Sequence, residues 1–156
     1  MTKRMGPDLH PEAGFTLIEL MITIVIGSIL LAVAIPGYQG QMRKSRRTEA
    51  RIAVLDLASR EERFLSTANN YSQTTTDLGY TGTFPVTVGS GYYTLTVTSP
   101  DPAFVGAGGT GPSYIVTATA TGLQLKDTAC RTFTVTHLGQ QTATDSGGTA
   151  TTTCWN

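Results

Sequence analysis

The chain has 156 residues, a formal net charge of zero and a charged fraction of 14%. Ordinary soluble domains carry about 25% charged residues, so part of this chain is expected to lie in an apolar environment. The length allows one domain plus an anchor, and the neutral balance excludes a strongly basic nucleic-acid-binding domain.

Residues 1–14 form a short polar segment that contains Lys3, Arg4 and His10 together with two prolines. This segment has no apolar periodicity, and we interpret it as a leader that is removed from the mature protein.

Residues 15–35 form an apolar run in which Glu19 carries the only charge. A helix of this length rises about 31 Å, the thickness of a bilayer's hydrocarbon core, so the run can span a membrane. A carboxylate in such a helix is costly unless a partner neutralises it. Glu19 is therefore a candidate functional residue, the alternative being a snorkelling residue without a role. A secretory signal peptide is a third interpretation, but this run is too long for one, and the small residue precedes the run.

The boundary between the leader and the apolar run carries a specific motif. Gly14 is followed by Phe-Thr-Leu-Ile-Glu, with Phe15 and Glu19 at the two ends of that pentapeptide, and the apolar run stops at Pro36. This arrangement resembles the prepilin signature of type IV pilins and pseudopilins.

In that family a membrane peptidase cuts after the glycine, and the new terminal residue is N-methylated. The resemblance therefore implies cleavage between Gly14 and Phe15, methylation of Phe15 by a prepilin peptidase/methyltransferase, and a role for Glu19 in subunit assembly. Electrostatics support this transfer. The α-amino group created at Phe15 would lie close to the Glu19 carboxylate of the same or a neighbouring subunit, and an apolar medium strengthens their attraction.

The residues after the apolar run continue a helical pattern. Proline costs a helix interior about 3 kcal/mol and glycine about 1 kcal/mol, so we predict a kink at Pro36 and Gly37. Residues 41–65 are amphipathic, with apolar side chains at helical spacing on one side. We expect one long helix from about Phe15 to Ser66, whose second half packs on the protein's own globular part.

Five basic residues follow closely on the apolar run: Arg43, Lys44, Arg46, Arg47 and Arg51. Contact with lipid phosphates or with a neighbouring subunit is the interpretation we favour, and an idle solvated face is the second. DNA binding is the third, but no aromatic residues are interleaved with the cluster as base stacking would require. The positive-inside rule would place the cluster in the cytoplasm; the leader motif and the cysteines argue for export, and we follow them.

The second half of the chain reads as a connecting loop followed by strands. Residues 67–91 are rich in Asn, Thr, Ser and Gly and are expected to form the loop, and the glycine-rich stretch 99–113 a second one. Apolar residues alternate with threonine in the segments 93–98, 116–121 and 132–136. Residues 84–88 are a weaker fourth candidate strand. This alternation predicts an antiparallel sheet with one face covered by the amphipathic helix and the other in water.

Cys130 and Cys154 are the two cysteines of the chain. Two thiols in an exported domain usually pair, whereas a zinc site wants four donors and the histidines are limited to His10 and His137. We therefore expect a disulfide, which in the loop-closure model removes about 3.5 kcal/mol of unfolded-chain entropy. The resemblance implies the same, because in type IV pilins a cysteine pair near the C-terminus holds the terminal loop on the sheet.

The sequence shows no catalytic constellation. His137 falls on the alternating face of Phe133 and Val135, where a strand-end histidine held by its neighbours is the favoured interpretation over a general base. We expect no enzymatic activity, no cofactor and no metal site.

These observations predict an α+β pilin fold. Its parts are a leader (1–14), a transmembrane and assembly half-helix (15–35), and an amphipathic half-helix with a globular head (36–156). The head is expected to hold about three or four antiparallel strands and a disulfide-closed C-terminal loop.

The resemblance implies a minor pilin, most like the PilE-like minor pilins. Such a subunit spans the inner membrane once before assembly and then enters an extracellular pilus, with roles in assembly, adhesion and twitching motility. Expected partners are the prepilin peptidase/methyltransferase, other pilin subunits, the inner-membrane assembly platform and membrane lipid. The alternatives are a pseudopilin of a type II secretion system, a class that commonly lacks the C-terminal cysteine pair, and a membrane-anchored binding module that never polymerises.

Overall fold

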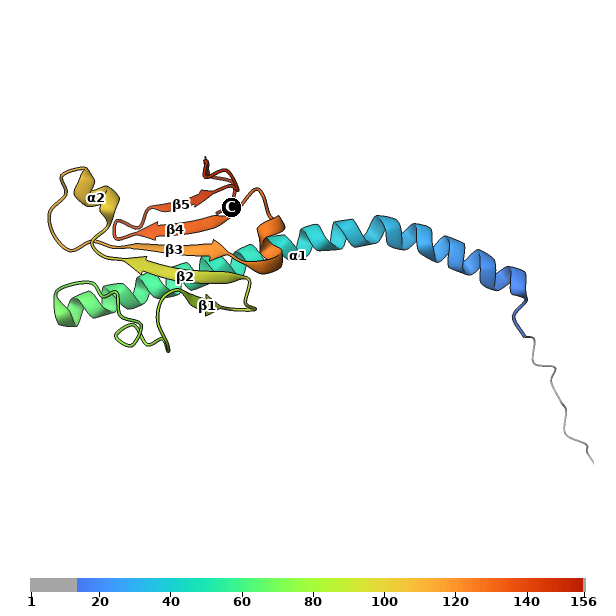
Figure 1. Cartoon of the computed structure of the whole chain (residues 1–156), viewed down its shortest axis with the longest axis horizontal. Coiled ribbons are helices and arrows are strands. Elements are labelled where there is room, and N and C mark those ends of the chain that lie inside the picture. Colours follow the sequence, from blue (N-terminus) through green and yellow to red (C-terminus); the bar gives the residue numbers. More distant parts are fainter. Residues whose placement is uncertain (1–13, 156) are drawn as a thin grey trace, which may run out of the picture. The chain divides into compact units, whose positions relative to one another are not determined.

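The computed structural model describes residues 14–155 of the chain (Figure 1). It divides into two units, one ending at Gln39 and one beginning at Gly40, and we call the second unit the head. Most of the predicted leader, residues 1–13, lies outside the described residues. Helix α1 (Leu17–Ala68) belongs to both units, and within the described residues it alone is long and apolar enough to cross a membrane. The long helix expected from the sequence is confirmed.

The N-terminal part of α1 exposes apolar side chains and satisfies its own hydroxyl groups. Thr23 Oγ1 donates to the carbonyl of Leu20, and Ser28 Oγ donates to the carbonyl of Val25, both at 2.8 Å. In a bilayer, polar groups must find such partners within their own segment. This part of α1 therefore has the surface and the internal hydrogen bonding that a membrane span needs.

Pro36 lies inside α1 and does not end it. Proline removes one backbone donor and crowds the preceding turn, but the long runs of helix on both sides outweigh that local cost. The kink at Pro36 and Gly37 stays a prediction.

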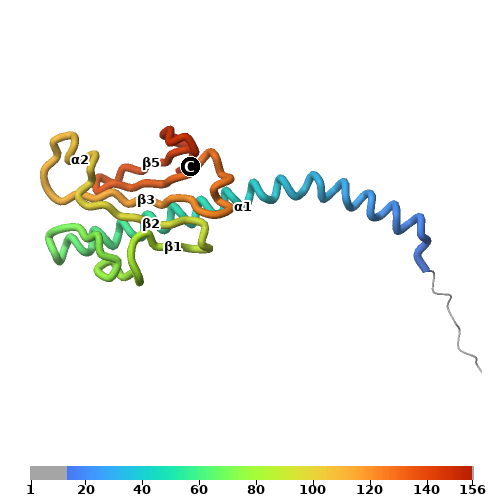
Figure 2. The backbone as a smooth tube through the Cα atoms, viewed as in Figure 1, coloured from blue at the N-terminus to red at the C-terminus, as the bar shows by residue number. Residues whose placement is uncertain are grey.

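The head contains one antiparallel sheet in which every strand pairs with its neighbour in sequence, in the order β1-β2-β3-β4-β5-β6 (Figure 1). The strands are β1 (Val86–Val88), β2 (Tyr93–Thr98), β3 (Ile115–Ala120), β4 (Thr132–Thr136), β5 (Gln141–Thr144) and β6 (Ala150–Thr151). The backbone trace in Figure 2 follows this up-and-down path. Short antiparallel connections produce such an order because consecutive strands pair directly.

The strand register places the apolar residues of adjacent strands on one face. Leu95 of β2 pairs with Ala118 of β3, Ala118 with Phe133 of β4, and Phe133 with Ala143 of β5. All four side chains are fully buried. The amphipathic side of α1 joins the same core through Ala50, Val54, Leu57 and Ala58. The predicted fold class, a helix packed on one face of an antiparallel sheet, is confirmed.

The sheet is wider than the three or four strands that the sequence indicated. β5 and β6 are short, and Ala143 is their one buried apolar residue, so they carry almost no alternation. These strands can be identified only from their pairing with neighbouring strands in the structure. Thr144 of β5, for example, pairs with Thr132 of β4, and the Oγ1 atoms of the two residues are hydrogen-bonded at 2.6 Å. The weaker candidate, residues 84–88, is confirmed in part as β1.

Two short helices lie in segments without clear sequence signals. Helix α2 (Pro102–Gly106) sits within the predicted loop 99–113, and the Asp101 side chain caps it by accepting from the Ala103 backbone N–H at 2.9 Å. The 3₁₀ helix η1 (Gly122–Lys126) follows β3. Both connect strands at the ends of the sheet.

Candidate functional site

The residues around the predicted cleavage point are exposed. Phe15 exposes 82% of its surface, and Glu19 lies in the first turn of α1, where a carboxylate is favoured by the helix dipole. The Glu19 backbone N–H donates to Thr16 Oγ1 at 3.2 Å, which helps to start the helix. Within residues 14–155 no cation contacts the Glu19 carboxylate. Any ionic partner of Glu19 therefore lies outside residues 14–155.

Three arginines of the basic cluster are held within the head. Arg47 forms two hydrogen bonds of 2.7 Å with the carboxylate of Asp127, which is only 3% exposed. These hydrogen bonds raise the pKa of Arg47. The Arg46 guanidinium lies 3.6 Å from the ring centroid of Tyr92, a cation–π contact. Arg51 donates to the carbonyl of Trp155 at 3.0 Å.

The basic cluster thus has two functions in one stretch of α1. Arg46, Arg47 and Arg51 attach the sheet, η1 and the C-terminus to the helix. The side chains of Arg43 and Lys44 form no hydrogen bond or ion pair within the described part of the chain, so their charges remain available to an external partner. In the sequence the five residues of the cluster differ little, since all are basic and close together. Their tertiary contacts show which of them bind to other parts of the head.

The predicted disulfide is present between Cys130 and Cys154. It is not the only restraint on the C-terminus. Trp155 donates from Nε1 to the carbonyl of Thr142 at 2.8 Å, and its ring lies edge-on to Phe133 with centroids 5.8 Å apart. Sequence reasoning missed Trp155, although it is the single tryptophan of the chain and adjoins a cysteine.

A buried carboxylate of α1 holds the start of the loop 67–91. Glu61 is fully buried, and its Oε2 accepts from the Ser72 backbone N–H at 3.0 Å. Its Oε1 has no hydrogen-bond partner within the described residues. Burial raises the pKa of Glu61 to about 7, and the nearby carboxylates of Glu62 and Asp77 also raise it. Sequence reasoning missed this residue; its position four residues after Leu57, on the apolar side of the helix, was the available signal.

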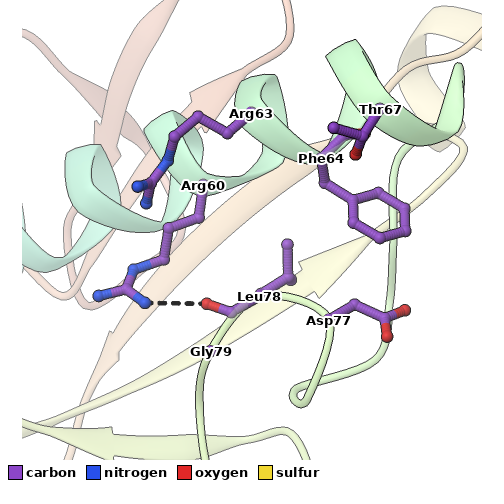
Figure 3. Close-up of a pocket in the computed structure, with 7 residues that line it drawn as sticks. All are labelled: Arg60, Arg63, Phe64, Thr67, Asp77, Leu78 and Gly79. Carbon is purple, nitrogen blue, oxygen red and sulfur yellow. Dashed lines mark hydrogen bonds between the residues drawn. The ribbon is translucent and has the colours of Figure 1, made fainter.

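An open pocket of about 320 Å³ lies between the C-terminal part of α1 and the same loop (Figure 3). Its lining residues are Arg60, Arg63, Phe64, Thr67, Asp77, Leu78 and Gly79. The Arg60 guanidinium is held in the pocket lining by two hydrogen bonds. Its Nη1 donates to the carbonyl of Leu78 at 3.0 Å, and its Nε donates to the Asp56 carboxylate at 2.7 Å. The pocket is a surface hollow between helix and loop.

His137 is held by aromatic neighbours at the end of β4. Its ring lies edge-on to Phe104 with centroids 4.5 Å apart, and its Nδ1 lies 4.0 Å from Asp101 Oδ2. Tyr114 also lies edge-on to His137, with centroids 6.5 Å apart, and the Asp101 backbone N–H donates to Ser113 Oγ at 3.1 Å. This enclosure agrees with the interpretation of a held strand-end histidine. Within the same described range, no three His, Cys, Asp or Glu side chains gather as metal ligands do.

Comparison with known families gives two matches that follow one another along the chain. Residues 9–35 match the prokaryotic N-terminal methylation motif. Residues 36–134 match the family described as type IV minor pilin ComP, DNA uptake sequence receptor. The second match covers the helical half and the sheet as far as the middle of β4.

Individual relatives match mainly over the N-terminal region. The type IV major pilin protein PilA of Myxococcus xanthus is 37% identical over 67 residues, 43% of this chain and 30% of the relative. Fimbrial protein Q of Moraxella bovis is 52% identical over 40 residues, 26% of each chain. The prepilin peptidase-dependent protein D of Escherichia coli is 53% identical over 41 residues, 26% of this chain and 28% of the relative.

These alignments cover about a quarter to a third of each relative's length. The family match is broader, because it takes in more than half of this chain and includes the sheet. The fold in the structure, a long apolar helix packed on a one-sided antiparallel sheet with a C-terminal disulfide, agrees with it. The chain therefore belongs to the type IV minor pilin ComP family.

Proposed function

We propose that this chain is a minor subunit of a type IV pilus. The observation that carries the proposal is the direct succession of a methylation motif at residues 9–35 and a minor-pilin head at residues 36–134. The motif supplies processing and an apolar helix, and the head supplies the surface that a filament presents. The role is structural: the subunit contributes to pilus assembly, and through it to adhesion and twitching motility, and has no catalytic activity.

In this proposal the subunit exists in two places. It first spans the inner membrane once through residues 15–35, after a prepilin peptidase/methyltransferase has cut between Gly14 and Phe15 and methylated Phe15. An assembly platform then transfers it into the extracellular filament, where the apolar helix packs among other pilin helices. The exposed apolar surface of this helix suits both environments, since lipid tails and neighbouring helices are similarly apolar.

Glu19 is the proposed assembly residue. Its carboxylate has no cationic partner among residues 14–155, and the free α-amino group of processed Phe15 would supply one in the same or a neighbouring subunit. An ion pair in an apolar medium is favourable only when both partners are present. Entry of a subunit into the filament would therefore be coupled to correct processing.

Intact-mass spectrometry of sheared filaments tests the proposal. The filament-associated chain should begin at N-methyl-phenylalanine at position 15. A chain that retains residues 1–14 would refute the processing claim, and a chain confined to the membrane fraction would favour a non-polymerising binding module instead. Recovery with a type II secretion pseudopilus, and not with pili, would favour the pseudopilin alternative.

DNA binding is a second candidate function, which the description of the matching family favours. Arg43 and Lys44, whose side chains form no hydrogen bond or ion pair within residues 14–155, are the residues we propose for phosphate contact. Each phosphate-contacting cation that is removed should lower the salt dependence of duplex binding by about one unit of slope.

The test uses the full chain and duplex oligonucleotides of genomic and scrambled sequence. The R43Q/K44Q variant should bind both duplexes more weakly, whereas Arg63→Gln, which removes a cation from the other end of the head, should not. No binding by the parent chain at low salt would refute this function.

A further inference from the structure

The 3₁₀ helix η1 exposes two leucines on a fixed support. Leu123 and Leu125 expose 60% and 45% of their surfaces, while Gln124 between them is fully buried. Gln124 Nε2 donates to the carbonyl of Arg43 at 3.2 Å and to the hydroxyl of Tyr93 at 3.1 Å. Because the middle residue is the anchor, its two neighbours are turned outward. The leucines are therefore held in place on the head surface.

Cationic side chains surround this apolar projection. The bond from Gln124 places η1 beside Arg43, and Lys126 ends η1. The neighbouring carboxylate of Asp127 is already paired with Arg47. Within the described chain no carboxylate contacts the side chains of Arg43, Lys44 or Lys126. We call this set the basal surface: Arg43, Lys44, Leu123, Leu125 and Lys126.

Acidic side chains collect away from the basal surface, further along α1 and on the loops packed against it. They are Asp56, Glu61, Glu62, Asp77 and Asp101, against Arg60 and Arg63. Three other carboxylates of the head already have partners: Asp127 pairs with Arg47, Glu49 accepts from Ser90, and Asp145 accepts from Gly147 and Thr149. The other cations of the head outnumber these three carboxylates, so the head has a basic end and an acidic end; they are Arg43, Lys44, Arg46, Arg47, Arg51, Lys126 and Arg131. An anionic surface would attract the basal end and repel the other.

We propose that the basal surface rests on an anionic bilayer while the subunit is still in the membrane. This rests on the proposed function, in which residues 15–35 span the bilayer. Arg43 lies eight positions after Ile35, the end of the apolar run, and eight helical positions rise about 12 Å. The length of this connection keeps Arg43 within reach of the lipid phosphates, which long cationic side chains extend to meet.

The composition of the basal surface favours lipid over DNA. A duplex offers phosphates to the cations, but it would meet the two leucines only at thymine methyl groups or by the unstacking of base steps, which is costly. A bilayer interface accepts both the cations and the leucines at once. Each cation near an anionic membrane strengthens binding about fivefold. The bound head would lie ready beside the membrane, and extraction into a filament would have to release η1 from the lipid.

Fluorescence quenching in vesicles tests this placement. The full chain is reconstituted into phosphatidylcholine vesicles, with or without phosphatidylglycerol, that contain lipid brominated near the top of the acyl chains. Leu125→Trp reports on η1. Leu138→Trp is the matched control, because Leu138 is 63% exposed and lies beyond the opposite end of β4. The parent chain gives the background from Trp155.

With phosphatidylglycerol present, quenching of the tryptophan fluorescence should be at least about twofold stronger in the Leu125→Trp chain than in the Leu138→Trp chain. Adding the substitutions R43Q/K44Q/K126Q to the Leu125→Trp chain should remove this difference. Equal quenching at the two positions in a chain that resists alkaline extraction overturns the inference alone. Extraction of the chain by alkali overturns the proposed membrane span and the inference together. A third outcome would assign the surface to DNA and overturn the inference. In it, quenching is equal at the two positions, and the chain binds a DNA duplex in a way that R43Q/K44Q/K126Q abolishes and L123S/L125S does not.

Discussion

The Arg47 guanidinium and the Asp127 carboxylate, 80 positions apart, meet in two parallel hydrogen bonds of 2.7 Å each. Gln124 reinforces the contact, because its Nε2 also donates to Asp127 at 3.1 Å. The pair fastens the end of η1 to α1 at the base of the head. An arginine that looks in the sequence like part of a lipid- or DNA-binding run is thus a structural residue.

Asp127→Asn should destabilise the head by about 2–4 kcal/mol, because it leaves the largely covered Arg47 without its counter-ion. Chemical denaturation of the full chain in detergent measures this loss. Lys44→Gln is the control, since Lys44 belongs to the same cluster but its side chain forms no hydrogen bond or ion pair within residues 14–155. Equal stability of the Asp127 variant and the parent would show that the ion pair contributes nothing net.

Glu61→Gln should change how stability depends on pH. Burial raises the pKa of Glu61 to about 7 from an ordinary value of 4.5, so the folded state binds a proton more readily than the unfolded state. The parent should therefore lose stability as pH rises from about 4.5 to 7, and then level off, by at most about 3 kcal/mol.

The glutamine variant should lack this loss: it should match the parent near pH 4 and exceed it near pH 8. Urea denaturation across that range measures both. Glu49→Gln is a matched control, because Glu49 also accepts from a loop backbone N–H, that of Ser90 at 2.9 Å, but is not fully buried. The account fails if the two glutamine variants show the same pH dependence.

Cys154→Ser should destabilise the head by about 3 kcal/mol, since it opens a loop that constrains the unfolded chain. The tail should nevertheless stay partly ordered, because Trp155 bonds to Thr142 and receives a bond from Arg51. Limited proteolysis should cut the C154S tail faster than the parent's, and the C154S/W155A tail faster still. Equal cutting of the single and double variants would show that Trp155 holds nothing once the disulfide is gone.

Glu19→Ala should leave the protein in the membrane but reduce its entry into filaments, because it lowers the cost of insertion and removes the proposed partner of the terminal amine. Immunoblots of membrane and sheared-filament fractions at equal expression measure the two effects. Thr23→Ala is the control, because the Thr23 hydroxyl is already satisfied by the carbonyl of Leu20. Normal incorporation of the Glu19 variant would argue against an assembly role.

The sequence by itself determined the features that depend on local spacing. The apolar run after Gly14 predicts a helix of membrane length, and the amphipathic stretch that follows predicts which face of α1 is covered, with Val54 and Leu57 in the core. Alternation with threonine predicts the one-sided sheet. The presence of two cysteines in a chain that is expected to be exported predicts a disulfide between them, because few other partners exist for either thiol. The helix and strand signals repeat within a few residues, and the cysteine pairing follows from the number of cysteines, so no knowledge of distant contacts is needed.

Only the tertiary structure decided which residues of similar type do different things. Arg47 is structural and Lys44 is free because Asp127, brought in from another part of the chain, reaches one of them and not the other. Glu61 is buried because Ser72 folds back over it. β5 joins the sheet through backbone pairing with β4 and leaves almost no apolar pattern. Backbone pairing between strands and long-range ion pairs leave no periodic pattern in the sequence, so they can be identified only in the folded tertiary structure.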